Sequence, residues 1–379
     1  MKSLIKMPKT KVTYIISGID WSIGFEWIVE NLNKDKIELS FVLLNPGDSY
    51  IENYLKEKGV LTKKILYRGK KDYVSALIKT YLFLIKQRPD IIHVHLFEAG
   101  MIGIVAGKLA GIHRRIYTRH YSTYHHVYAP HAVKYDKLIN KLSTDIVSIS
   151  ENVTQILISE GVDKNKICKV PHGFNINYFR NPDVNIIRQL KEKYKTEGKY
   201  PVIGVISRYT EWKGIQYTIP AFKKLLETYP EAKLVLANAR GDYAPNIRKL
   251  LSGLPYNAYV EIDFEYQLAE LYQLFDIFVH VPIDHHSEAF GQIYVEALAA
   301  GIPSIFTMSG IAHEFIKDKE NAIVVPYKDS DAIYEAIMEI IKNNELRNRI
   351  KENGRIIVEQ FSLDRLMKNL ENLYLQSKV

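Results

Sequence analysis

The regular alternation of short apolar runs with longer amphipathic stretches most constrains the fold of this chain. The runs are rich in β-branched and aromatic residues, as in VTYIIS (12–17), DIIHVHL (90–96) and VIGVIS (202–207). Each run is followed by a segment with helical periodicity. Strands that alternate with helices predict a parallel sheet that is covered by helices on both faces, so we expect an α/β protein.

The alternation is interrupted once, shortly after residue 171. A non-periodic stretch, HGFNINYFRNPD, and a highly charged one, RQLKEKYKTEGKYP, separate two series of predicted strands. The chain has 379 residues, whereas a single hydrophobic core stops growing at about 250–300 residues. We therefore predict two consecutive doubly wound domains, residues 1–172 and 173–358, and a helical C-terminal segment, residues 359–379. Ligands of such sheets bind at the carboxyl ends of the strands.

The composition indicates where in the cell the protein works and which partners suit it. The single cysteine, Cys168, cannot form an intramolecular disulfide, which fits a cytoplasmic protein. No segment has the long uncharged run that a transmembrane helix needs, so we expect a cytoplasmic chain, soluble or peripheral at the inner face of the membrane. The net charge is +8, and basic residues exceed acidic ones only in the N-terminal half. That half suits a polyanionic acceptor, an anionic membrane or nucleic acid, although solubility alone also explains the charge.

The most informative segment is SEAFGQIYVEALAAGIPS (287–304). It follows a predicted strand, and Gly291 is expected to open a helix. The backbone N–H groups of Phe290, Gly291 and Gln292 would then lie at the helix start, where the helix dipole also favours an anion such as a diphosphate.

Two glutamates belong to the same segment. Glu288 lies in the loop before the helix, and Glu296 lies on the helix eight positions later. A carboxylate only accepts hydrogen bonds, so Glu296 suits the two hydroxyls of a ribose and Glu288 suits those of a sugar. From their spacing alone, the two residues also fit a capped amphipathic helix with solvated glutamates.

The segment resembles the paired-glutamate motif of the retaining glycosyltransferases of the GT-B fold, specifically glycosyltransferase family 4. The resemblance implies that Glu296 holds the nucleotide ribose and that Glu288 faces the donor sugar. It also implies two Rossmann-like domains that face each other across a cleft. The N-terminal domain would bind the acceptor, and the C-terminal helix would cross back to it. The matching positions are Glu288, Phe290, Gly291, Glu296, Ala297, Ala299, Gly301 and Pro303.

A second match lies upstream, in VIGVISRYTEWKGIQYTIPAF (202–222), which resembles the family's strand–Arg–loop–Lys-Gly–helix unit. Arg208 is expected to end a strand and Lys213 to start a helix at the carboxyl edge of the sheet. Arginine chelates two phosphate oxygens and lysine supplies a compact charge, so the pair would stabilise a leaving diphosphate. Two surface cations are the alternative interpretation.

The N-terminal half matches less closely. The loop SGIDWSIGFEWIVENL (17–32) resembles the family's glycine-rich loop near the diphosphate, where Gly24 and Glu26 match and Ile23 replaces a usual glycine. His120, which follows the run RRIYT, resembles a family histidine near the reactive end of the sugar. The resemblance therefore implies that Gly24 contacts the donor and that His120 orients the sugar.

Other histidines allow several interpretations. His93 and His95 lie on one face of a predicted strand and could ligate a metal, but no third ligand is identifiable, so we interpret them as core histidines. The basic and aromatic loop YTRHYSTYHHVYAPH (117–131) could stack bases, face a sugar or lipid-linked acceptor, or be partly buried.

These observations predict a retaining, metal-independent hexosyltransferase-type enzyme that needs no cofactor. It would move a sugar from a nucleotide-diphosphate donor to an acceptor hydroxyl. Retention and metal independence come from the resemblance alone. Family analogy suggests a saccharide or lipid-linked saccharide acceptor, in capsule, lipopolysaccharide or glycolipid synthesis, and no nucleic-acid partner. A nucleotide-sugar epimerase of the same fold and a non-catalytic nucleotide-sugar-binding protein remain alternatives. Nucleic-acid binding through the basic half is a third, and it predicts binding that weakens steeply with salt.

Overall fold

The computed structural model describes residues 8–376 and divides the chain into two compact units. Unit 1 consists of Met1–Gly173 with Leu363–Val379, and unit 2 is Phe174–Ser362. The C-terminal segment joins unit 1 from Leu363, not from residue 359 as predicted. Residues Val358–Phe361 form a 3-10 turn, η7, that stays in unit 2 because Phe361 packs against Phe290 and Phe315 there.

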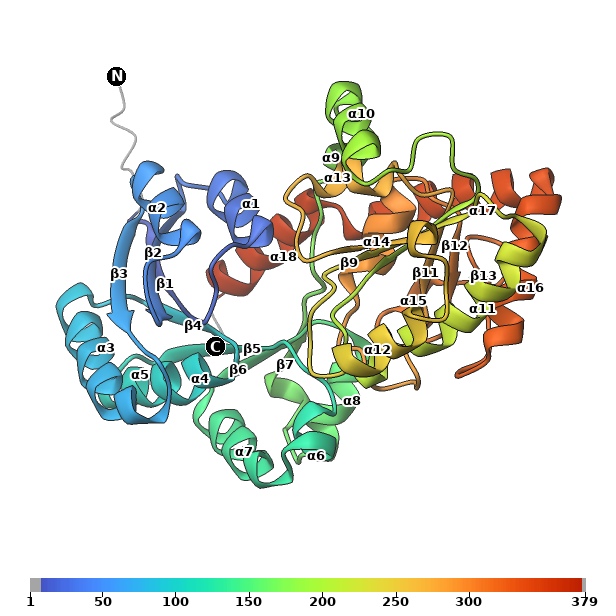
Figure 1. The fold of residues 1–379 in the computed structure, drawn as a ribbon. Coiled ribbons are helices and arrows are strands. Elements are labelled where there is room, and N and C mark those ends of the chain that lie inside the picture. Colours follow the sequence, from blue (N-terminus) through green and yellow to red (C-terminus); the bar gives the residue numbers. More distant parts are fainter. Residues whose placement is uncertain (1–7, 377–379) are drawn as a thin grey trace, which may run out of the picture. The chain divides into compact units, whose positions relative to one another are not determined.

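Unit 1 is built on a seven-stranded parallel sheet in the order β3-β2-β1-β4-β5-β6-β7 (Figure 1). The direction of winding changes between β1 and β4, which is the kind of switch point where α/β sheets bind ligands. Its strands are β1 (Thr10–Ser17), β2 (Ile37–Asn45), β3 (Leu61–Leu66), β4 (Ile91–His95), β5 (Arg114–Arg119), β6 (Asp145–Ser148) and β7 (Ile167–Lys169).

Strand β3 was not predicted, because its sequence LTKKIL carries two consecutive lysines. It pairs only with β2, at the edge of the sheet. Charged side chains are common on edge strands, where they discourage pairing with another chain. Edge position therefore explains why this strand lacks an apolar run.

Helices cover the sheet of unit 1 on both faces (Figure 1). The predicted glycine-rich helix 99–111 is observed as α4, a π-helical turn η2 (Gly100–Ile104) and α5. Its glycines allow close packing as predicted, since a Cβ on Gly107 would lie 2.2 Å from Ile92 Cδ1. The helices are α1 (Ile23–Asn31), α2 (Tyr50–Glu57), α3 (Tyr73–Gln87), α4 (Phe97–Ala99), α5 (Val105–Leu109), α6 (Tyr124–Tyr128), α7 (Val133–Leu142), α8 (Glu151–Ser159) and α18 (Leu363–Leu375).

Unit 2 contains a six-stranded parallel sheet in the order β10-β9-β8-β11-β12-β13. Here the winding reverses between β8 and β11. Two consecutive Rossmann-like parallel-sheet folds therefore confirm the predicted fold class. The strands are β8 (Val202–Ile206), β9 (Lys233–Ala237), β10 (Tyr259–Ile262), β11 (Ile277–His280), β12 (Ser304–Phe306) and β13 (Ile323–Val324).

The helices of unit 2 form two groups. In one, α11 packs against α12 and α16, and in the other, α14 packs against α9 and α17. Among the described residues, 8–376, no helix of either unit has the length and apolarity to cross a membrane. The helices are α9 (Ile176–Arg180), α10 (Val184–Lys193), α11 (Ile215–Thr228), α12 (Ala244–Leu251), α13 (Leu268–Tyr272), α14 (Gln292–Ala299), α15 (Ala312–Phe315), α16 (Ser330–Lys342) and α17 (Asn344–Ile357).

Candidate active site

The switch point of unit 2 brings two distant segments of the sequence together. Strands β8 and β11 are hydrogen-bonded neighbours, with Ile203 opposite Ile277. The segment with Arg208 and Lys213 follows β8, and the loop with Glu288 follows β11. Both therefore leave the carboxyl edge of the sheet at the place where doubly wound folds bind ligands.

Lys213 is placed by a short turn. It ends the 3-10 turn η5 (Glu211–Lys213), and α11 starts only at Ile215, so the prediction that Lys213 starts a helix is displaced by two residues. The intervening Gly214 has φ 75°, and a Cβ there would lie 1.8 Å from the Val281 carbonyl oxygen. Only glycine fits this conformation and this close contact. The turn therefore lies directly against the segment that follows β11.

Glu288 is buried and held by cationic and neutral donors. The Lys213 ammonium forms an ion pair with Glu288 Oε1, and His280 Nε2 lies 2.9 Å from the same oxygen. Burial alone would raise the pKa of the Glu288 carboxyl. The Lys213 charge and the His280 hydrogen bond outweigh burial and lower this pKa to about 2. Glu288 is therefore a fixed negative charge at any pH near neutrality.

Helix α14 starts as predicted, immediately after Gly291. Gly291 has φ 84°, and its carbonyl accepts the Tyr294 N–H at 3.1 Å. The N–H groups of Gly291 and Gln292 precede this first turn and point out of the helix start, which favours an anion. Gln292 is exposed, whereas Phe290 is buried and stacks on Phe174.

Glu296 lies on α14 in a different environment from Glu288. Its side chain is buried, and Tyr272 Oη donates a hydrogen bond to Oε2 at 2.9 Å. Within residues 8–376 no cation forms an ion pair with this carboxyl, and desolvation raises the pKa of Glu296 to about 7. The pKa values of the two glutamates in this motif are thus shifted in opposite directions, which argues against the interpretation that both side chains are solvated.

Arg208 is not part of the Glu288 cluster. Strand β8 ends at Ile206, so Arg208 follows the strand by two residues and does not end it. Its side chain is exposed and forms no ion pair with a residue in the range 8–376. It therefore lies beside the same strand end with its guanidinium accessible, and its role at a phosphate stays a prediction.

In unit 1, the predicted residue Gly24 lies in a helix. It is the second residue of α1, which Ser22 caps by accepting the Phe25 N–H at 3.4 Å. A Cβ on Gly24 would meet only Ser22 Oγ, at 3.8 Å. The backbone therefore does not require glycine at this position, and its contact with a donor stays a prediction.

His120 follows β5, and its imidazole contacts the imidazoles of two other histidines. Its Nε2 lies 3.0 Å from His95 Nδ1, and its ring stacks on that of His172 with centroids 5.5 Å apart. Burial lowers the pKa of His120 well below its usual value, so the ring is neutral near pH 7. The structure thus positions His120 firmly, while its role at the sugar stays a prediction.

His93 is a core histidine, as predicted. Its two ring nitrogens contact Tyr374 Oη at 2.5 Å and Thr118 Oγ1 at 2.6 Å. Tyr374 of α18 also contacts Tyr14 Oη at 2.5 Å, which joins the C-terminal helix to β1 and β4. Among residues 8–376 no group of three or more histidine, cysteine, aspartate or glutamate side chains is arranged to hold a metal ion.

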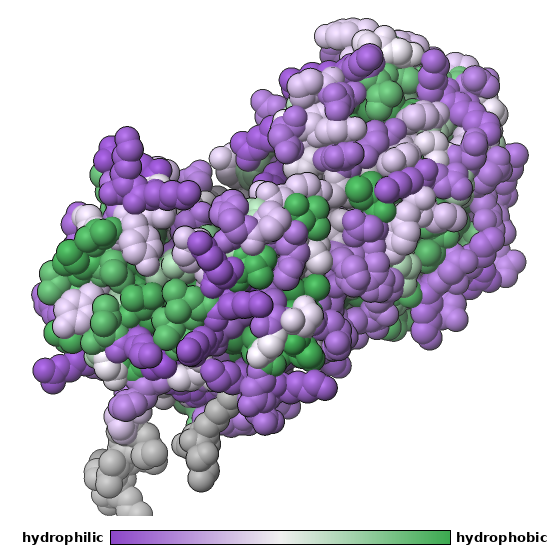
Figure 2. All heavy atoms as spheres, turned by 90° about the horizontal axis from the view of Figure 1, so that it is seen from below, coloured by the Kyte–Doolittle hydropathy of each residue, from purple (hydrophilic) through white to green (hydrophobic). Residues whose placement is uncertain are grey.

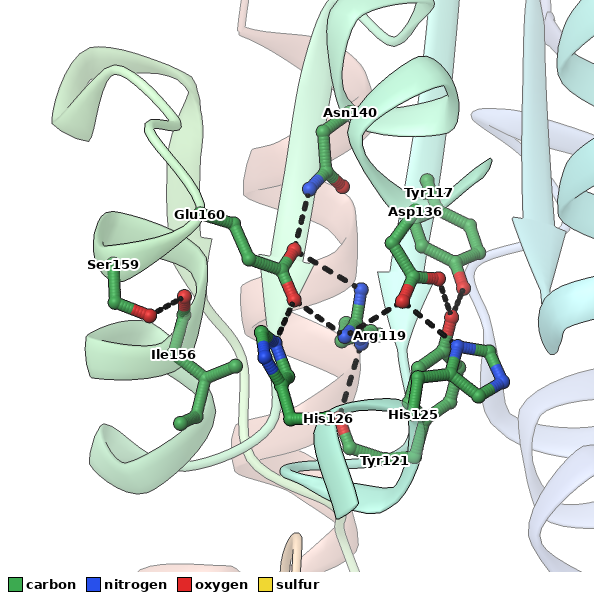
Figure 3. A network of polar contacts seen from close by, with 10 residues as sticks. All are labelled: Tyr117, Arg119, Tyr121, His125, His126, Asp136, Asn140, Ile156, Ser159 and Glu160. Atoms are coloured by element: carbon green, nitrogen blue, oxygen red, sulfur yellow. Dashed lines mark hydrogen bonds and ion pairs between the residues drawn. The ribbon is translucent and has the colours of Figure 1, made fainter. Parts of the chain in front are cut away.

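The basic and aromatic loop after His120 is partly buried, which was one of the three interpretations. Figure 3 shows Arg119 at the centre of a buried network that the loop joins through His125 and His126. Arg119 contacts Glu160 at 2.8 Å and Asp136 at 3.4 Å. His125 contacts Asp136 at 2.7 Å, and His126 contacts Glu160 at 2.9 Å. The network therefore holds the loop to α7 and to Glu160, the residue that follows α8.

Sequence reasoning missed three residues around the two glutamates. His280 ends β11, Tyr272 ends α13, and Ser309 Oγ accepts the Glu288 N–H at 3.1 Å. The position of His280 at a strand end, eight residues before Glu288, was the only available signal. Tyr272 and Ser309 reach the site through tertiary packing, which the sequence does not display.

Comparisons with known proteins agree with this architecture. Residues 186–356 match the family described as glycosyl transferases group 1, and residues 28–178 match glycosyltransferase family 4. The chain is 28% identical to the capsular polysaccharide biosynthesis glycosyltransferase CapM of Staphylococcus aureus, over 79% of this chain and 80% of CapM. It is 24% identical to the alpha-monoglucosyldiacylglycerol synthase of Acholeplasma laidlawii, over 76% of each chain.

Among solved structures, Anabaena HepE, determined in complex with UDP and glucose, has the same fold. The two structures superpose with a TM-score of 0.81 at 17% sequence identity, over 96% of this chain and 99% of HepE. At this identity the likeness concerns the fold alone.

Proposed function

Because the chain belongs to the family-4-like glycosyltransferases of the GT-B fold, we propose that it transfers a sugar from a nucleotide-diphosphate donor to an acceptor hydroxyl with retention. One observation carries the proposal: the Lys213–Glu288–His280 cluster and the start of α14 both lie in segments that follow the strands of the switch point of unit 2. A fixed carboxylate suits the hydroxyls of a sugar, and the helix start suits a diphosphate.

The chemistry follows from these charges. The bond between the anomeric carbon and the phosphate oxygen breaks, and Lys213, Arg208 and the N–H groups of Gly291 and Gln292 stabilise the charge on the leaving diphosphate. Glu288 is a weak nucleophile because Lys213 and His280 already hold its carboxylate. The acceptor oxygen therefore attacks the same face of the sugar, and its proton passes to the leaving diphosphate. Donor and acceptor alone balance the reaction, which involves no redox change. We propose that it needs no metal or cofactor, because Lys213, Arg208 and the N–H groups at the start of α14 supply the positive charge that a divalent metal would otherwise provide.

We also propose a cell-surface glycan or glycolipid as the product. The name of CapM refers to capsular polysaccharide, and the name of the Acholeplasma synthase refers to a diacylglycerol. A lipid or lipid-linked saccharide acceptor lies in a membrane, so the protein would work as a peripheral protein at the inner face of the membrane.

The test is transfer with EDTA present and a panel of UDP-, GDP-, ADP- and CDP-sugars. We expect one donor to be consumed only when a saccharide or glycolipid acceptor is added. Proton NMR of the product should show the anomeric configuration of the donor. Turnover of the donor to an epimer without acceptor would contradict the proposal and favour the epimerase. Tight nucleotide binding without any turnover would favour the non-catalytic alternative.

Nucleotide affinity should depend on pH through Glu296. Ribose hydroxyls donate to a carboxylate, so binding requires the ionised form, whereas the pKa of Glu296 in the free protein is about 7. Affinity should therefore rise by up to about tenfold per pH unit below pH 7 and level off above it. Calorimetry in two buffers of different ionisation enthalpy should detect the released proton.

Glu296→Gln should remove this pH dependence and the proton release, and it should weaken binding above pH 7. The nucleotide phosphate titrates near pH 6 in every variant, so the comparison with Glu296→Gln isolates the carboxyl. Glu335→Gln, on the exposed side of α16, is the matched control and should behave as the parent protein. The same pH profile in parent and Glu296→Gln would refute the assignment of Glu296 to the ribose.

A further inference from the structure

One face of unit 1 carries a row of exposed apolar side chains on α3. Val74, Ile78, Leu82 and Ile85 are between 42% and 64% exposed. Their spacing of three and four residues places them on one side of the helix, opposite the buried residues Ala76, Thr80 and Leu84. Helix α3 is therefore apolar on its outer side as well as toward the core, whereas the outer side of a surface helix is usually polar.

The row continues over neighbouring helices. Helix α3 packs on α5, α5 on α7, and α7 on the turn that joins it to α6. Figure 2 views this side of the unit and shows hydrophobic residues gathered among hydrophilic ones. We call the surface of these four helices the α3–α7 face. Besides the α3 row, its exposed apolar side chains are Leu109, Tyr124, Val127, Tyr128, Tyr135 and Leu138.

The charge of the α3–α7 face has one sign. Helices α3, α5 and α6 contain no acidic residue, and the only one on α7, Asp136, is buried against Arg119. None of the exposed lysines on these helices forms an ion pair with a residue in the range 8–376. These lysines are Lys79, Lys86, Lys108, Lys134, Lys137 and Lys141.

We propose that the α3–α7 face docks on the surface of a lipid bilayer that contains anionic lipids. The aliphatic and tyrosine side chains would enter the boundary between headgroups and acyl chains, and the lysines would contact anionic headgroups. Long lysine side chains suit this arrangement because their methylene stems cover apolar surface while the ammonium stays at the headgroups.

The charge pattern favours lipid over other occupants. Lysine is depleted in protein–protein interfaces. A symmetric dimer through this face would bring the same lysines of two copies together, because a twofold interface pairs a surface with itself. Nucleic acid offers no counterpart to an aliphatic row. The inference extends the membrane attachment in the proposed function, and it can be tested without the transfer reaction.

The test is co-sedimentation of the full chain with vesicles of phosphatidylcholine alone or with about one third phosphatidylglycerol. We expect binding to the anionic vesicles that weakens with salt. Replacing Lys79, Lys86 and Lys137 by Gln should weaken it on the order of 100-fold, because each lysine near a charged membrane contributes about a factor of five. The double variant I78S/L82S should also lose most binding. Both variants should keep the parent's urea unfolding midpoint when it is followed by the fluorescence of Trp21 and Trp27, which both lie in unit 1, and this would show that unit 1 folds.

Matched controls come from exposed residues of unit 2. The double variant Tyr256→Ser/Ile356→Ser removes comparable apolar surface, and Lys249→Gln removes an exposed lysine. We expect both to bind vesicles as the parent does. Parent-like binding by I78S/L82S and by the lysine triple variant would overturn the inference. The inference would also be overturned if the parent did not bind vesicles. A dimer in sedimentation velocity that I78S/L82S abolishes would overturn it as well. Transfer to a short soluble acceptor tests the proposed function separately.

Discussion

Glu288→Gln is expected to lower kcat on the order of 10³-fold with little change in donor affinity. The substitution keeps the shape of the side chain but removes the charge that Lys213 and His280 hold in the site. A fixed, buried charge of this kind stabilises the transition state more than the ground state, and removing one such group costs about 10²–10³ in kcat. Steady-state kinetics with whichever nucleotide sugar of the panel serves as donor would measure it.

Lys213→Met should have an effect of similar size, and the double variant Lys213→Met/Glu288→Gln should be little worse than either alone. Residues that act as a unit are non-additive, because each needs its partner to be effective. Lys224→Met is the matched control, since Lys224 lies on the adjacent helix α11 in an exposed pair with Asp331. It should retain parent activity. If Glu288→Gln retained full activity, or if the two losses simply multiplied, the proposed roles would be wrong.

Arg119→Met is expected to destabilise unit 1 by about 3–5 kcal/mol. Arg119 and its partners Asp136 and Glu160 are fully buried, so removing the guanidinium leaves two carboxylates without their shared cation. Breaking a buried ion pair at one partner typically costs this much, because an uncompensated charge remains. Methionine fills much of the same volume, so loss of packing contributes little.

Tryptophan fluorescence can assign this loss to the correct unit. In a Trp212→Phe background the remaining tryptophans, Trp21 and Trp27, both lie in unit 1. Urea unfolding should then show a lower midpoint for Arg119→Met. Arg68→Met breaks an exposed pair with Asp72 in the same unit and should cost no more than about 1 kcal/mol. An equally small effect of Arg119→Met would mean that the network contributes little to stability.

The network also explains why the loop after His120 could not be interpreted from its sequence. A histidine- and tyrosine-rich segment has the composition of a binding loop. Whether His125 contacts a ligand or Asp136 depends on where α7 packs, and packing of α7 against β5 is a tertiary property. The same holds for His95, the last residue of β4, whose contact with His120 joins it to the residue that follows the neighbouring strand β5.

Local sequence pattern was sufficient to predict much of the fold of this protein. The alternation of apolar runs and amphipathic stretches predicted two parallel-sheet folds, because buried strands and amphipathic helices differ in periodicity. Turn chemistry predicted the start of α14 after Gly291, and the paired glutamates pointed to the family. Strand β3 was not predicted, because an edge strand needs no continuous apolar run.

Strand order was decided only in the folded chain. Lys213 and Glu288 meet because β8 lies beside β11, although the sequence follows β8 with β9. That adjacency depends on how helices cover the two faces of the sheet and on no local signal. The opposite environments of Glu288 and Glu296 have the same origin. Each residue is a glutamate in one short motif. Lys213 and His280, which lower the pKa of Glu288, and the packing that buries Glu296 and raises its pKa come from other elements of unit 2.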